Sequence, residues 1–115
     1  MIVELVTFRA TPGADWNAVL TEARATIPRW RANPQLVRKH YLLSEDGAEC
    51  AGLYIWTTRT AAEAAHDAAW QAAVEQRTGA APTIRYFEQQ MLLDNEAGTV
   101  TEWSREGAIV TRPAE

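Results

Sequence analysis

The chain has 115 residues, of which 47% are hydrophobic, and a formal net charge of −4 from 11 basic and 15 acidic side chains. A chain of this length folds as one domain with a core of its own, and its basic residues form no stripe that would bind nucleic acid. The single cysteine, Cys50, allows no internal disulfide. The start, MIVELVTF, lacks the long apolar run of a signal peptide or membrane span. We therefore expect a cytoplasmic protein.

The first quarter of the chain predicts a strand followed by a helix. Residues 2–8 are rich in β-branched side chains and end at a Thr-Pro-Gly turn signal, which is typical of a strand. From Asp15 onward, apolar residues recur at spacings of three and four, which predicts an amphipathic helix that Pro28 should end or kink. The apolar stripe consists of Trp16, Val19, Leu20, Ala23, Ile27 and Trp30.

Two extended runs, LVRKHYLLS and GAECAGLYIWT, flank Asp46-Gly47 and predict a β-hairpin with a two-residue type I′ turn. The turn sets the register of the two strands. In that register Tyr41 lies over Gly52, an aromatic ring covering a strand glycine. The pairs expected on one face are Lys39 with Tyr54, Tyr41 with Gly52, and Val37 with Trp56.

The second half predicts an alanine-rich helix over Thr60–Arg77, with a capping box formed by Thr60 and Glu63, and then a fourth strand, TIRYFEQQMLL. The resulting order is βαββαβ, an α+β ferredoxin-like fold with a four-stranded antiparallel sheet and two helices on one face. We expect this domain to span residues 1–95. Residues 96–115 form a tail, in which AIV is either a short extra strand or part of a loose end.

Both faces of the predicted sheet carry large apolar side chains, although two helices can cover only one of them. The face opposite Tyr54 carries His40, and the sequence does not decide which face lies under the helices. An uncovered apolar face usually marks an interface. We therefore predict a homodimer packed through its sheet faces.

The string PQLVRKHYLLSEDGAECAGLYIWTTRTAAEAAHDAAW, with GAAPTIRYFE and LLDN after it, resembles the YdhR-like members of the antibiotic-biosynthesis-monooxygenase superfamily. The resemblance covers roughly residues 1–95 and implies a dimeric α/β-barrel. The residues that carry it are Lys39 among aromatic neighbours, Ser44-Glu45, Gly52 with Tyr54, the aromatic residue at 56, and His66.

The resemblance also limits the chemistry. Haem-degrading relatives have an asparagine on the first strand, then a tryptophan and a histidine on the second helix, where this chain has Val6, His66 and Gln76. Haem degradation is therefore disfavoured. The quinone-forming members use neither metal nor flavin, and the sequence shows no metal-ligand spacing and no glycine-rich fingerprint. We expect no cofactor.

The activity implied is a cofactor-independent mono-oxygenation of flat aromatic, phenolic or polyketide-like molecules in a pocket between sheet and helices. Such a reaction needs a base, a positive group for the substrate anion, and an apolar cleft. His66 is the candidate base, because imidazole exchanges protons near neutral pH. The candidate substrate-binding residues are Trp70, Tyr54, Trp56 and Trp30 as walls, and Arg85 or Lys39 as the group that holds the oxyanion.

Each of these residues also has a structural explanation. His66 can be a half-buried residue bound to a backbone carbonyl, Trp16 and Trp30 can belong to the core, and Lys39 can extend over the sheet or pair across a dimer. Arg85 can serve solubility. The alternative function is a non-catalytic dimeric module that binds a small molecule or is purely structural. An open cavity that touches His66 favours the oxygenase, and a closed core favours the module.

Overall fold

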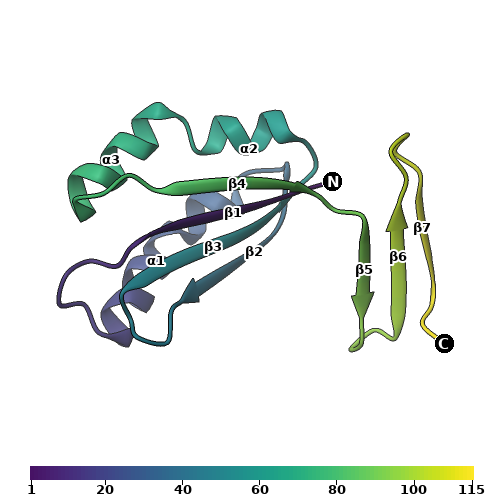
Figure 1. Cartoon of the computed structure of the whole chain (residues 1–115), viewed down its shortest axis with the longest axis horizontal. Coiled ribbons are helices and arrows are strands. Elements are labelled where there is room, and N and C mark those ends of the chain that lie inside the picture. The colour runs from purple at the N-terminus through teal and green to yellow at the C-terminus, as the bar shows by residue number, and fades with distance from the viewer.

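The computed structural model describes residues 1–115, which form a four-stranded sheet with helices on one side and a separate three-stranded sheet (Figure 1). The large sheet is antiparallel with the strand order β2-β3-β1-β4, so the predicted α+β class and βαββαβ order are confirmed. No helix has both the length and the apolar character needed to cross a membrane. The elements are β1 (Ile2–Arg9), α1 (Trp16–Arg31), β2 (Leu36–Leu43), β3 (Glu49–Trp56), α2 (Arg59–Ala65), α3 (Ala68–Thr78), β4 (Thr83–Glu88), β5 (Met91–Asp94), β6 (Thr99–Trp103) and β7 (Ile109–Pro113).

Helix α1 begins where predicted, because the Asp15 side chain accepts a hydrogen bond from the backbone N–H of Ala18 at 2.9 Å. Pro28 does not end the helix, which continues for three more residues, and the Pro28 carbonyl accepts a hydrogen bond from Ala32. The expectation that Trp16 belongs to the core is wrong, since Trp16 is 68% exposed. Trp30 is the only residue of α1 that is buried.

The predicted helix Thr60–Arg77 is two helices, because the chain leaves helical geometry at His66 and Asp67. Asp67 caps α3, its carboxylate accepting a hydrogen bond from the Trp70 N–H at 2.9 Å. An aspartate side chain competes with the helical backbone in this way, which favours a new helix start over continuation. The first helix is capped by Thr58 and not by Thr60. The break turns His66 into the space between helices and sheet.

The hairpin register agrees with the prediction in its centre. Lys39 pairs with Tyr54, and Tyr41 pairs with Gly52. All four residues lie on the sheet face that the helices cover, because Tyr54 packs in the core beside Trp30 of α1. The question of which face lines the interior is therefore answered.

The two ends of the hairpin differ from the prediction. Leu36 lies opposite Trp56 in place of Val37, because a bulge interrupts β2. At the other end the loop has four residues, 45–48, and only Gly47 has a positive φ, at 75°. The type I′ turn is thus absent. The register survives because the longer loop is centred on the same peptide bond as the predicted one.

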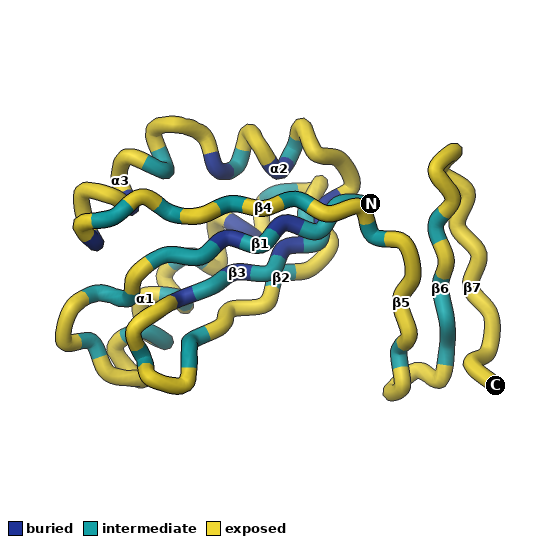
Figure 2. Tube along the Cα trace, in the orientation of Figure 1, coloured by how far each residue is buried: buried dark blue, intermediate teal, exposed yellow.

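The predicted fourth strand divides at residues 89–90 into β4 and β5, which belong to different sheets. Pairing of β4 with β1 ends where β1 itself begins, and the last hydrogen bond runs from the Gln89 N–H to the Met1 carbonyl at 3.0 Å. The chain then leaves the main body and forms β5, β6 and β7 (Figures 1 and 2). The predicted tail, from residue 96, contributes two strands to this sheet, and the Ala114 N–H donates a hydrogen bond to the Gly98 carbonyl at 2.9 Å.

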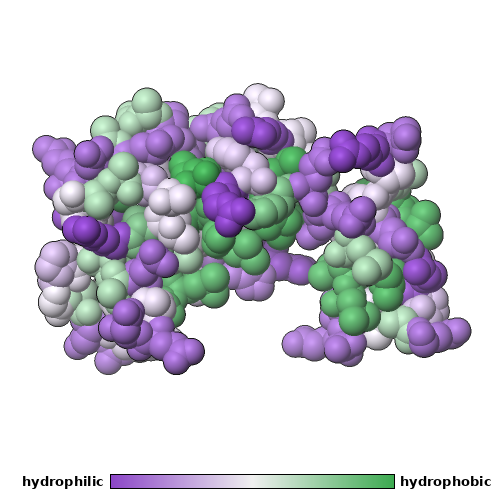
Figure 3. Space-filling model, in the orientation of Figure 1, coloured by the Kyte–Doolittle hydropathy of each residue, from purple (hydrophilic) through white to green (hydrophobic).

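The buried residues lie on the two central strands, β1 and β3, and on the helices (Figure 2). The core cluster consists of Val6, Trp30, Tyr54, Trp56 and Ala62. The opposite face has no helix over it, and Phe87 there is 44% exposed. Hydrophobic side chains gather over the main strands and over the small sheet, where Met91 and Ile109 are exposed (Figure 3).

Gly52 is a strand glycine that leaves no room for a side chain. A Cβ at this position would lie 2.6 Å from Cε1 of Tyr54, so the ring that covers the glycine belongs to Tyr54 and not, as predicted, to Tyr41. A methyl group at residue 52 would force the Tyr54 ring out of the core.

We predict that Gly52→Ala lowers the free energy of unfolding by about 1–3 kcal/mol, the usual cost of overpacking a core. Urea denaturation measures this cost. In a Tyr54→Ala background the same substitution should cost clearly less, because the opposing ring is gone. An equal cost in both backgrounds would contradict the role assigned to the ring.

Candidate functional site

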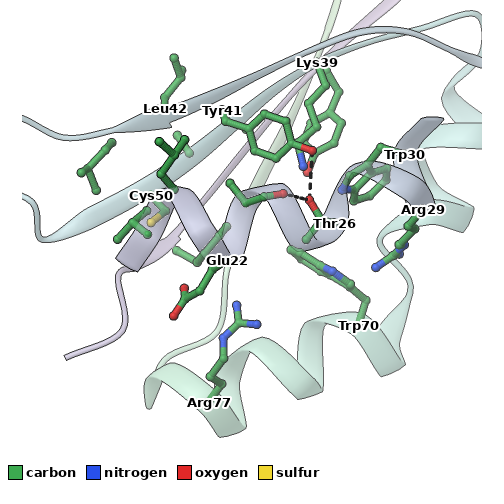
Figure 4. A pocket seen from close by; sticks show the side chains of 18 of the residues that line it. Glu22, Thr26, Arg29, Trp30, Lys39, Tyr41, Leu42, Cys50, Trp70 and Arg77 are labelled. Carbon is green, nitrogen blue, oxygen red and sulfur yellow. Dashed lines mark hydrogen bonds between the residues drawn. The ribbon is translucent and has the colours of Figure 1, made fainter. Parts of the chain in front are cut away.

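A cavity of about 210 Å³ lies between α1, α3 and the hairpin of β2 and β3 (Figure 4). It is lined by 19 residues, of which 13 are hydrophobic, so its walls suit an apolar molecule with few polar groups. Small side chains of α1, including Ala23 and Thr26, leave the space open. The aromatic walls are Phe8, Trp16, Trp30, Tyr41, Tyr54 and Trp70.

Lys39 reaches the cavity through a cage of three aromatic rings. Its Nζ lies 4.3 Å from the centroid of Trp30, 4.1 Å from that of Tyr41 and 4.6 Å from that of Tyr54. None of the ion pairs in the protein includes Lys39. The Tyr41 ring is held in place by a hydrogen bond between its hydroxyl and that of Thr26, at 3.0 Å (Figure 4). We call Lys39 and its three rings the lysine cage.

The cage changes the proton affinity of the amine. The pKa of Lys39 is lowered from 10.5 to about 7, chiefly by burial and also by the positive charge of Arg29, while the negative charge of Glu4 partly opposes both effects. Stacking of an ammonium on ring faces favours the charged form and therefore acts against this lowering. Near neutral pH, a substantial fraction of Lys39 is therefore an uncharged amine.

A buried carboxylate lies on the far side of the aromatic walls. Glu4 is fully buried, and its Oε1 accepts a hydrogen bond from Trp56 Nε1 at 2.9 Å. His66 Nδ1 lies 2.9 Å from the same oxygen, but the approach is too oblique for a hydrogen bond, so the contact is electrostatic and strongest when the imidazole is protonated. Burial and the nearby Glu4 charge raise the pKa of Tyr86 to about 12. We call Glu4, Trp56 and His66 the carboxylate network.

His66 does not line the cavity. The residue is 2% exposed, and its imidazole packs against the rings of Trp70, Tyr54 and Trp30, with centroids 4.5, 4.7 and 5.3 Å away. Direct proton transfer from a molecule in the cavity to His66 would require one of these rings to move. The assignment of His66 as the base stays a prediction.

The other predicted site residues divide between the cavity and two further places. Trp56 is fully buried in the carboxylate network. Arg85 pairs with Leu5 on β1 and lies on the uncovered sheet face, with its guanidinium 4.9 Å from the Phe87 ring centroid. Neither residue reaches the cavity. The predicted residues that do line it are Trp30, Lys39, Tyr54 and Trp70.

Two residues of the site had no place in the sequence-based prediction. Glu4 lies between Ile2 and Val6 on the inward face of β1, and a charged residue at an inward position of an apolar strand is the signal that could have identified it. Arg29 lines the cavity and donates a hydrogen bond to the Ala65 carbonyl at 2.7 Å, at the end of α2. Nothing in the sequence indicates this contact between distant residues.

Comparison with known proteins relates the chain to others through its fold. No protein-family model matches the sequence, and no curated protein is similar enough to count as a relative. Among solved structures, an antibiotic biosynthesis monooxygenase superposes with a TM-score of 0.60 and 13% identity, over 77% of this chain and 98% of its own. The structure of Rv0793 from Mycobacterium tuberculosis superposes with a TM-score of 0.59 and 18% sequence identity, over 82% of this chain and 97% of its own.

A third solved structure contains a ligand. It is a monooxygenase from the gene ActVA-Orf6 of Streptomyces coelicolor in complex with nanaomycin D, with a TM-score of 0.59 and 19% identity, over 82% of this chain and 92% of its own. At these identities the likeness establishes a shared fold. The chain thus has the ferredoxin-like fold of antibiotic biosynthesis monooxygenases.

The hydrogen bond from Trp56 to Glu4 should contribute measurably to the stability of the fold. Trp56→Phe leaves the buried Glu4 carboxylate without its indole donor, and we expect a loss of about 1.5–3 kcal/mol in the free energy of unfolding, the usual worth of a hydrogen bond to a charged group. Trp103→Phe is the matched control, because the Trp103 indole N–H is buried without any partner. Urea denaturation of both variants checks this, and equal losses would contradict it.

Proposed function

We propose that the protein is a small cofactor-independent mono-oxygenase, of the YdhR-like kind, that acts on flat aromatic, phenolic or polyketide-like molecules. The observation that carries the proposal is the cavity itself, which combines apolar aromatic walls with a lysine that has no anionic partner. The fold shared with monooxygenases, one of which was solved in complex with the ligand nanaomycin D, supports the same function.

The reaction draws its electrons from the substrate. In an anthrone, the ring methylene loses both hydrogens and becomes a carbonyl, while one atom of dioxygen enters that carbonyl and the other leaves as water. The four electrons that reduce dioxygen all come from the methylene carbon. The protein has to remove the first proton, stabilise the anion that forms, and hold the flat ring system away from water.

The cavity residues fit the binding part of this task. Trp70 and Trp30 line the cavity as aromatic walls for a flat molecule, and Lys39 offers a positive charge for a phenolate or enolate oxygen when it is protonated. Burial also raises the pKa of Tyr54, so its hydroxyl stays protonated beside the cavity. A hydrophobic phenolic substrate matches this combination better than a sugar or a phosphate does.

A non-catalytic binding module is the second candidate, and the position of His66 favours it. The predicted base is sealed behind aromatic rings, as a purely structural histidine would be. The two functions differ in one measurable respect. A binding module takes up flat aromatic ligands without consuming dioxygen.

Oxygen consumption tests the proposed function. The purified protein, free of added cofactor, should consume dioxygen in the presence of a dihydroxyanthrone and place one labelled oxygen atom from ¹⁸O₂ in the quinone product. Trp70→Ala should reduce kcat/KM about tenfold or more, because it removes one wall of the cavity. Tight ligand binding without oxygen uptake would replace the oxygenase with the binding module.

The second part of the proposal is a homodimer formed through the uncovered sheet face. This face presents apolar residues that no helix covers (Figures 1 and 3). The three-stranded sheet of β5, β6 and β7 extends beyond the main body, where it can contact a second copy of the chain. Burial of both surfaces would complete a barrel from two four-stranded sheets. The apolar residues of the face include Val3, Leu5, Leu53, Ile55 and Phe87.

We predict that sedimentation at micromolar concentration finds a dimer, and that Phe87→Glu shifts the protein towards monomer by placing a charge in the apolar interface. Ala72→Glu, on the exposed surface of α3, should sediment like the parent protein. A parent protein that sediments as a monomer would remove the dimer from this account.

A further inference from the structure

Lys39 is the only lysine in the chain, and the other ten basic side chains are arginines. Arginine remains protonated at every pH a protein experiences, whereas lysine can lose its proton when it is buried. The one basic side chain of this protein that can act as a neutral amine therefore lies in the lysine cage on the cavity wall.

The remaining polar groups of the cavity are poor proton acceptors for a phenol or a carbon acid. Arg29 donates to the Ala65 carbonyl, and Arg77 lies with its guanidinium 5.8 Å from the Phe8 ring centroid. Glu22 is a carboxylate, a far weaker base than a phenolate, and accepts a hydrogen bond from Thr11. The tyrosine hydroxyls keep their own protons at neutral pH and so are poor acceptors of another. Burial raises the pKa of the Cys50 thiol, so this cavity residue also keeps its proton near neutral pH. The cavity wall thus holds one amine among groups that are weaker bases or are already protonated.

We propose that Lys39, as an uncharged amine, is the general base that takes the first proton from the substrate. This inference rests on the proposed oxygenase function and gives its proton-removal step to a different residue from His66. The substrate O–H or C–H bond breaks, its electron pair stays on the substrate, and a new N–H bond forms on Nζ. The proton leaves later in the water made from dioxygen, which regenerates the amine.

The lysine cage suits both forms of the amine. Burial destabilises the ammonium enough to free the amine near neutral pH, where a base works best. Once the proton has moved, the faces of Trp30, Tyr41 and Tyr54 surround the new ammonium, and the substrate anion beside it supplies the counter-charge that the empty cage lacks. Charge therefore develops next to groups that stabilise it during the reaction.

The charged groups around Lys39 oppose one another. Arg29, from α1, disfavours the ammonium, whereas Glu4, from β1, favours it. Tyr41 and Tyr54, from β2 and β3, face the amine as neutral rings. Because a base must be unprotonated to act, the rate of proton removal should rise with pH through about 7 and then level off.

The experiment measures proton removal apart from oxidation. Under argon in D₂O, the protein is mixed with a dihydroxyanthrone, and exchange of the ring methylene hydrogens for deuterium is followed by NMR. The parent protein should accelerate exchange, and Lys39→Arg should lose about 100-fold or more of that acceleration, the range expected for a positioned base. Binding of the ligand, followed by quenching of tryptophan fluorescence, should change little in this variant.

Lys39→Arg also separates the two roles that Lys39 could have. A residue that only holds an anion would be replaced well by arginine, so retained exchange in this variant would overturn the proposal. His66→Phe fills the same aromatic site but removes the imidazole beside the buried Glu4 carboxylate, so it should lower the melting temperature. Below that temperature, where the variant is folded, it should retain exchange. Loss in His66→Phe with retention in Lys39→Arg would return the base to His66.

The single lysine allows a direct check that needs no substrate. Protein labelled with ¹³C at lysine Cε has one such signal, and its titration should have a midpoint near pH 7. A midpoint near 10.5 would contradict the proposal. Exchange without oxygen uptake would keep Lys39 as a base and refute only the oxygenase function.

Discussion

The burial of the Glu4 carboxylate is the constraint on which the interior of this protein depends. A carboxylate buried beneath the helices is not hydrated, and this costs free energy unless donors or positive charges inside the protein compensate for the lost water. Trp56 donates a hydrogen bond to it, and His66 approaches it from the break between α2 and α3. Strands β1 and β3 and the second helical segment are thereby tied to one oxygen atom. The orientation of the Trp56 indole is fixed by this hydrogen bond, and the Asp67 cap that ends the first helical segment places His66 beside the same oxygen.

The aromatic layer above Glu4 has two sides with different tasks. Its inner side seals the carboxylate network, with the imidazole of His66 in contact with Trp30, Tyr54 and Trp70. Its outer side forms the wall of the cavity, where the same three residues meet the space that a ligand would fill. The rings of Trp30 and Tyr54 thus contact His66 of the carboxylate network and also Lys39 of the lysine cage.

The sequence predicted what depends on local periodicity. The order of strands and helices and the pairing of Lys39 with Tyr54 could be read from alternation and from a turn centred at Asp46-Gly47, even though the turn type was wrong. The break at Asp67 was missed, because an alanine-rich pattern masks a capping residue in its middle. The division of the fourth strand was missed for a different reason, since it is set by where β1 begins, far away in the sequence.

The candidate site was predicted in part, because composition shows which residues are aromatic or basic but not which side of a ring faces a cavity.

We propose above all that this cavity binds a flat phenolic molecule with its acidic group at Lys39. The most direct measurement is a crystal structure of the protein with an unreactive anthraquinone. We predict that the rings lie among Trp30, Tyr54 and Trp70, with an oxygen within hydrogen-bonding distance of Lys39 Nζ. A ligand bound elsewhere, or one that reaches His66 instead of Lys39, would contradict this account.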